Sequence, residues 1–176
     1  LKSDPLPGRV HFNGALFWNQ FDDIQLTTTD PSNGLARRFN AGKGHSVGAE
    51  AETFVQITRD LDLHYTASYL YSALDKFRGR VSRTVLASGQ VYNNTPYAGA
   101  PLPFSPRFQT MGSLTYKIPV RLPGVFRIGA DVSFQAALYT SSQTNPQNRL
   151  TPQTYVNAMA SWTSPDKRWF LQATAR

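Results

Sequence analysis

The sequence predicts an all-β chain, an antiparallel meander of about seven long strands that forms part of a transmembrane β-barrel wall. Apolar and polar residues alternate in segment after segment, and each segment ends at a turn or a polar loop. The alternation from Phe126 to Leu138 is longer than a usual strand, which has about five to six residues. It suits a strand that crosses a bilayer, which needs roughly nine to eleven residues. Aromatic residues make up 12% of the chain, as expected where rings lie at both membrane interfaces.

The first two strands are expected from about Arg9 to Thr27 and from about Arg38 to Ile57. Side chains on a strand point to opposite faces in turn, so each segment has one apolar and one wet face. The first strand places on its apolar face Val10, Phe12, Gly14, Leu16 and Trp18, and the second Val47, Ala49, Ala51, Val55 and Ile57. The Asp-Pro-Ser-Asn-Gly run at 30–34 predicts a turn between them.

The third strand is expected to follow a tight turn at 58–60 and to end near Phe77. Its apolar set contains Leu63, Tyr65, Ala67, Tyr69, Tyr71 and Ala73. The stretch from Arg78 to Ser105 is rich in Gly, Asn, Pro and Ser, and it is therefore expected to be a long irregular loop.

The fourth and fifth strands are expected from about Arg107 to Ile118 and from Phe126 to Leu138, with a short turn at 119–124. A polar loop at 141–153 then leads to a sixth strand that places Val156, Ala158, Ala160 and Trp162 on its apolar face. After a turn at 164–168 the seventh strand starts at Trp169. Connections therefore alternate between long and short, which is typical of outer-membrane barrels and is not required of a soluble sandwich.

Composition excludes several other classes of protein. The chain has 176 residues and no cysteine, so it has no disulfide or thiolate site. Its mean hydropathy is −0.38, and it contains no apolar run long enough for a transmembrane helix. The net charge is +7, but the cations are expected mainly in loops and turns, without a nucleic-acid-binding motif. We therefore expect no nucleic-acid partner.

The sequence also predicts no enzyme activity, cofactor or metal. The histidines His11, His45 and His64 lack the spacing of metal ligands, and the aspartates near residue 22 lack the pattern of a calcium loop. Glycines at 42, 44 and 48 superficially resemble a phosphate-binding loop, but they continue into a strand rather than opening a helix. They are expected instead to thin the wall or to allow a close approach of another backbone.

The chain is expected to be a single incomplete domain, residues 1–176, because about seven strands leave unpaired edges that a barrel in lipid must close. It also starts without an export signal and ends within a strand. Both features predict a piece of a larger barrel.

Motifs in order along the chain resemble those of TonB-dependent outer-membrane receptors. They are the strand Ala15–Leu26 with its Asp-Ile-Gln-Leu end, Asn40–Glu52 with its Gly-x-Glu-x-Glu pattern, Ala67–Phe77, the Gly-x-x-Leu-Pro run of Gly99–Arg107, and Thr154–Ala158 followed by Trp162. The resemblance covers nearly the whole chain and corresponds to the late part of the receptor barrel. Arg176 departs from the terminal aromatic residue with which that family ends.

The resemblance implies a section of a 22-stranded barrel without the plug domain, in the outer membrane of a Gram-negative bacterium. It implies import of a scarce nutrient, most similar to ferric siderophore complexes, energised by the TonB–ExbB–ExbD system through an amino-terminal part absent here. Lipid and lipopolysaccharide are the expected surroundings. The alternatives are a passive outer-membrane pore or structural barrel, which a plug and TonB box upstream would exclude, and a soluble β-sandwich binding module.

Two groups of residues are candidates for the functional site. Arginines and tyrosines of the long loops could meet an anionic or aromatic ligand, or they could be solvated loop residues or contacts to lipopolysaccharide: Arg37, Arg38, Arg80, Arg83, Tyr92, Tyr97, Tyr139 and Arg149. Polar residues on the wet faces are expected to line the lumen and contact a plug: Glu50, Glu52, Arg127, Asp131 and Gln135.

Overall fold

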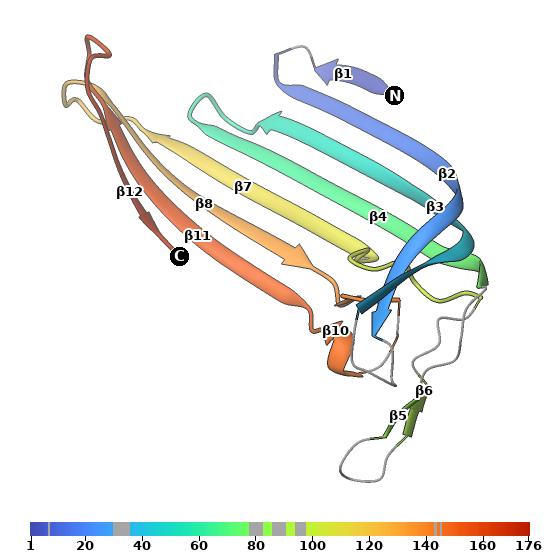
Figure 1. Cartoon of the computed structure of the whole chain (residues 1–176). Coiled ribbons are helices and arrows are strands. Elements are labelled where there is room, and N and C mark those ends of the chain that lie inside the picture. Colours follow the sequence, from blue (N-terminus) through green and yellow to red (C-terminus); the bar gives the residue numbers. More distant parts are fainter. Residues whose placement is uncertain are drawn as a thin grey trace.

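The computed structural model describes residues 1–6, 8–29, 36–77, 83–85, 91–93, 98–142, 144 and 146–176. Its main element is one curved antiparallel sheet of eight strands, in the order β1-β2-β3-β4-β7-β8-β11-β12 (Figure 1). Each strand pairs with its neighbours in the chain, apart from two small hairpins inserted between them, so the predicted meander is confirmed. A closed barrel is not formed by this chain alone, because β1 and β12 are the two edges of the sheet.

The strands of the sheet differ in length. Their bounds are β1 Lys2–Leu6, β2 Val10–Thr29, β3 Ala36–Gln56, β4 Leu61–Phe77, β7 Phe108–Ile118, β8 Val125–Gln135, β11 Gln153–Thr163 and β12 Phe170–Ala175. The small elements are β5 Arg83–Val85, β6 Val91–Asn93, β9 Leu138–Tyr139, β10 Arg149–Leu150 and the 3₁₀ turn η1 Pro146–Asn148. All long connections leave the sheet at one end, and the short turns lie at the other (Figure 1).

The structure corrects the sequence prediction at several points. The sheet contains an additional strand, β1, which pairs with β2 through Lys2–Asn13 and Ser3–Phe12. The stretch predicted to be an irregular loop contains the β5–β6 hairpin. The predicted fifth strand ends at Gln135, and Leu138 belongs to the separate β9–β10 pair.

The early end of β8 follows from the loss of its partner. The Ala136 N–H donates to the Phe108 carbonyl at 2.9 Å, and Phe108 is the first residue of β7. Beyond this point β7 offers no further residue to pair with, so the chain leaves the ladder and forms a new hairpin with β10.

The pairing of the three longest strands is irregular near the end with the long connections. There β2 has a bulge between Phe21 and Ile24, with Asp23 at φ 56°. The Asn40 amide donates to Asp23 Oδ1 at 2.9 Å and accepts the Gly42 N–H at 3.0 Å. Gly42 has φ 106°, and a Cβ there would lie 2.5 Å from the Lys76 carbonyl oxygen, so only glycine fits. The predicted close approach of another backbone is confirmed at this glycine.

Gly48 has a second steric role. It pairs with Phe17 in the β2–β3 ladder, and a Cβ at this position would strike the Phe17 ring and lie 2.5 Å from the Tyr69 carbonyl oxygen. The Phe17 ring therefore lies over Gly48 and occupies the space that a side chain at Gly48 would need.

The turn between β11 and β12 is held by side chains. Ser164 Oγ donates to Asp166 Oδ1 at 2.6 Å and accepts the Trp169 N–H at 2.9 Å, and the same Asp166 oxygen accepts the Arg168 N–H at 3.2 Å. Asx- and Ser-type bonds of this kind stabilise a tight turn and place Lys167 at φ 58°.

Candidate functional site

The two faces of the sheet differ in chemistry because register aligns the alternating residues of all strands. One row joins Val10, Val55, Leu63, Leu114, Ala130 and Ala158, and the next joins Phe12, Thr53, Tyr65, Gly112, Val132 and Val156. Trp18 is 64% exposed and Leu16 86%, so this apolar face lacks any covering layer of protein among the described residues. Such a continuous exposed apolar face requires a non-aqueous partner.

Aromatic side chains flank the apolar face at both ends. Tyr69 and Phe108 share a row near the long connections, with Trp18 and Tyr71 in the next row, whereas Phe126 and Trp162 share the row next to the short turns. Strand β7 has 11 residues between these levels. At about 3.4 Å per residue and a tilt of about 40°, its ends are roughly 26 Å apart along the barrel axis, close to the ~25 Å apolar band of membrane barrels.

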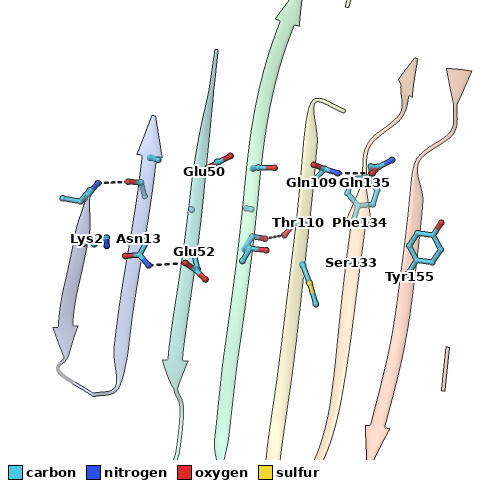
Figure 2. Close-up of a pocket in the computed structure, with 18 residues that line it drawn as sticks. Lys2, Asn13, Glu50, Glu52, Gln109, Thr110, Ser133, Phe134, Gln135 and Tyr155 are labelled. Carbon is cyan, nitrogen blue, oxygen red and sulfur yellow. Dashed lines mark hydrogen bonds between the residues drawn. The ribbon is translucent and has the colours of Figure 1, made fainter. Parts of the chain in front are cut away.

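The opposite face of the sheet is polar and hollowed. A cavity of about 700 Å³ is lined by polar side chains that alternate with the apolar set, and Figure 2 shows them side by side across the strands. They include Asn13, Glu50, Glu52, Gln109, Gln135 and Tyr155. This concave face is the candidate functional site, because it is where convergent polar groups and a cavity coincide.

Glu52 is the most connected carboxylate in this cavity. Its Oε2 accepts a hydrogen bond from the Asn13 amide at 3.2 Å, and its Oε1 lies 3.1 Å from His64 Nε2. The three residues come from β2, β3 and β4, so the contact joins three neighbouring strands. Glu50, two residues earlier on the same face, has no hydrogen-bond partner among the described residues and stays exposed.

A second polar group lies on the later strands. The Asn157 amide donates to Asp131 Oδ2 at 2.6 Å, and the Gln109 amide donates to Gln135 Oε1 at 3.0 Å. Arg127 shares this face, in the row of Lys117 and Ser161 nearer the short turns.

The structure therefore places all predicted lumen residues on one face, with Glu50, Glu52 and Gln135 around the cavity. Sequence reasoning did not identify their partners Asn13, His64 and Asn157 as site residues, although the alternation places each of them on the polar face of its strand.

A small apolar cluster lies at the long-connection end of the structure. Leu26, Leu74 and Ala100 are buried together, with Ile24 and Leu102 packed against them. The segment after Gly99 is held to β4 by the Leu74 N–H, which donates to the Ala100 carbonyl at 2.9 Å. Ser72 Oγ donates to Ser105 Oγ at 2.6 Å, and Ser72 lies on the polar face. The segment before β7 thus folds onto the concave face, which the sequence did not predict.

The residues predicted to lie in the long loops are found in several different parts of the structure. Tyr139 and Arg149 are direct cross-strand partners in the β9–β10 hairpin. Arg37 and Arg38 lie within β3, paired with Thr28 and Thr27. The strand start expected at about Arg38 is therefore confirmed, whereas grouping these two arginines with the loop residues was wrong. The β2–β3 ladder continues past the bulge and includes them. Arg83 and Tyr92 lie on the paired strands β5 and β6, and Arg80 and Tyr97 lie outside the described residues.

Other kinds of site find no support in the described part of the chain. It contains no group of three or more His, Cys, Asp or Glu side chains able to hold a metal ion. No described helix has the length and apolar character needed to cross a membrane.

Comparison with known proteins gives a consistent result. A family model described as TonB dependent receptor-like, beta-barrel matches residues 2–176. The fold is similar to that of the siderophore receptor PiuA from Acinetobacter baumannii, with 22% identity, a TM-score of 0.65, and coverage of 92% of this chain and 21% of that chain. It is also similar to the ferric yersiniabactin uptake receptor FyuA from Yersinia pestis, with 17% identity, a TM-score of 0.66, and coverage of 94% and 21%. The chain thus spans about a fifth of the length of these receptors. No curated protein matches its sequence.

Proposed function

The chain belongs to the TonB-dependent receptor β-barrel family, and we propose that it is a section of the wall of an outer-membrane receptor that imports ferric siderophore complexes. In this proposal the import step is energised by the TonB–ExbB–ExbD system, through parts of the protein that lie outside this chain. The receptor resides in the outer membrane of a Gram-negative bacterium.

The observation that carries the membrane part of the proposal is the pair of opposite faces. One face is apolar, exposed and flanked by aromatic rows roughly 26 Å apart, which fits lipid. The other face is polar and concave, which fits a lumen filled by water or by a polar domain. A soluble β-sandwich would bury the apolar face against a second sheet.

Contact with a plug domain is proposed for the concave face. Glu50 and Glu52 face the cavity, and Gln135 and Asp131 extend the polar surface toward β8. Glu50 has unused acceptor capacity among the described residues, so it is available to a cationic donor of a plug. Glu52 is positioned by Asn13 and His64, and its carboxylate is exposed to the same partner.

The ligand is proposed to meet the end of the sheet with the long connections. Arg38, Tyr139 and Arg149 supply cations and a phenol ring there, and the last two are cross-strand neighbours. Arginine suits anionic oxygen ligands and tyrosine suits aromatic groups, both of which siderophore complexes can present. The two similar structures are named as a siderophore receptor and a ferric yersiniabactin uptake receptor, which supports this class of ligand.

Lipopolysaccharide is proposed to contact the outer rim of the apolar face. Arg107 lies over the Tyr71 ring, with its Cζ 5.6 Å from the ring centroid, and the His45 ring lies 5.7 Å from Tyr71. His45 Nδ1 is 2.5 Å from Asp75 Oδ1. Arg107 is the cation of this group and stacks on an aromatic ring directly after the apolar band, where phosphate head groups would lie.

Uptake of radioactive ⁵⁵Fe tests the proposed function. The full protein would be expressed in a bacterium that lacks its own ferric siderophore receptors, with tonB present or deleted. We expect accumulation of at least one ferric siderophore that depends on tonB and is abolished by a protonophore. Accumulation that is independent of tonB would instead identify a passive pore.

A matched pair of variants tests the site. Glu50→Gln should alter plug retention and uptake, because it removes the charge offered to the plug. Asp62→Asn, on the same polar face but at the end with the short turns, also removes one negative charge and controls for general changes of lumen charge. Equal effects of the two variants would contradict a specific role for Glu50.

A further inference from the structure

A groove on the apolar face lies next to the short turns of β7–β8 and β11–β12. It has a volume of about 440 Å³ and is lined by Ile118, Phe126, Ile128, Trp162 and Leu171 with two alanines, and also by Arg127, Ser161 and Gln172, which alternate with these residues along β8, β11 and β12. Ala160 pairs with both Ile128 and Ala173, so two methyl-sized side chains lie between larger ones. The result is a channel with small side chains at its floor and bulky ones along its edges.

The edge of this groove toward the turns is tied together by Trp162. Its indole Nε1–H donates to the Pro123 carbonyl at 3.0 Å, which connects β11 to the β7–β8 turn. The Phe126 and Trp162 rings lie 6.3 Å apart at a tilt of 43°. A Cβ on Gly124 would strike the same indole, so the ring is packed closely against the turn. Tryptophan in this position marks the interface between hydrocarbon and head groups.

The two turns beside the groove carry three cations and one carboxylate. Arg121 lies in the first turn, and Lys167 and Arg168 lie in the second, all of them exposed. The carboxylate of Asp166 is engaged by Ser164 and lies 3.7 Å from Arg168 Nε. Arg121 and Lys167 have no acidic partner among the described residues. Two unpaired cations therefore border the aromatic edge of an apolar channel.

We propose that this groove and its two turns bind one anionic phospholipid of the periplasmic leaflet. An acyl chain occupies the channel over Ala160 and Ala173, and the head-group phosphate lies between Arg121 and Lys167. The assignment to the periplasmic leaflet rests on the proposed function, because membrane barrels of this kind place their short turns on the periplasmic side. A lipid with net negative charge fits better than a zwitterionic one, whose ammonium group would meet the same two cations.

Lipid enrichment in nanodiscs tests this proposal. The full protein is reconstituted with phosphatidylethanolamine containing a small fraction of phosphatidylglycerol, and the lipids retained after partial delipidation are counted by native mass spectrometry. The test variant is Arg121→Gln with Lys167→Gln. The matched control is Arg9→Gln with Arg59→Gln, which removes two exposed cations from other short turns, away from the groove.

We expect the wild type to retain phosphatidylglycerol preferentially and the test variant to lose that preference. Each cation near an anionic surface multiplies affinity by roughly fivefold, so the loss should approach about 30-fold, with the control near wild type. Ala160→Phe should also displace the lipid because it fills the channel, whereas Ala158→Phe, one row farther from the turns, should not.

Two results would overturn the proposal. Equal losses in test and control pairs would mean that the turns attract anionic lipid by diffuse charge, without a site. If the wild type retained neither lipid preferentially, the protein would have no binding site selective for an anionic phospholipid. A protein that does not enter nanodiscs at all would instead refute the membrane wall, and this outcome is distinguishable because no lipid would then be retained.

Discussion

Placing an arginine at adjacent positions of β8 tests the assignment of the two faces. Val132 belongs to the apolar row with Gly112 and Val156, whereas Ser133, the next residue, lines the concave cavity. Val132 is level with Gly112 in β7, so it lies within about 3 Å of the middle of a band roughly 26 Å tall. The substitutions Val132→Arg and Ser133→Arg thus add the same side chain to opposite environments.

The expected difference is large. An arginine on the lipid face near the midplane of a membrane barrel costs about 2–4 kcal/mol, and this corresponds to a roughly 30- to 900-fold shift of the unfolding equilibrium. At Ser133 the guanidinium can reach water in the cavity, so its cost should stay below about 1 kcal/mol.

Guanidinium unfolding of the full protein in lipid vesicles, followed by tryptophan fluorescence, measures both values. Ala130→Arg, one row nearer the short turns, is a second lipid-face variant and should resemble Val132→Arg. If Ser133→Arg destabilised the protein as much as Val132→Arg, the assignment of lipid and lumen faces would be wrong.

Three further predictions follow from local contacts. Gly48→Ala should destabilise the protein by about 1–3 kcal/mol through overpacking in chemical denaturation, whereas Gly112→Ala should be tolerated because its Cβ would meet only an ordinary contact at 3.6 Å. Trp162→Phe should cost about 0.5–1.5 kcal/mol in the same assay, because the indole hydrogen bond to the β7–β8 turn is lost. The pKa of Asp166 is lowered, first by the Ser164 hydroxyl and then by a backbone N–H. Because its folded pKa is below the unfolded value, its stabilisation of the turn is present above about pH 4 and lost as pH falls through the folded pKa. The protection factor of the Arg168 amide against hydrogen exchange, which corrects for the intrinsic pH dependence of exchange, should fall as pH falls over that range, and Asp166→Asn should remove this fall.

Much of the fold could be predicted because alternation is a local property. The apolar residues of β2, from Val10 to Trp18, and those of β4 lie on the face that the sequence assigned to them. The rule needs only that side chains on a strand point to opposite faces in turn. For the same reason Glu50, Glu52 and Gln135 were expected on one face, and they line one cavity.

Features that depend on a neighbouring strand were not predictable. The segment Lys2–Leu6 has no alternation and contains Pro5, and it is a strand because the edge of β2 offers it partners. Conversely, the apolar–polar alternation of the sequence continues past Gln135 to Leu138, but the pairing of β8 with β7 stops at the first residue of β7.

The sequence by itself therefore determined the class of fold, the order of the long strands, the two chemically distinct faces and the resemblance to a receptor family. Each of these depends on residue type and spacing along the chain. Only the tertiary structure decided the eight-stranded register, the carboxylate network of Asn13, Glu52 and His64, the inward fold of the segment before β7, and the groove beside Trp162. These features bring together residues from different strands, and the alignment of strands is set by pairing and close packing across the sheet, which spacing along one strand does not encode.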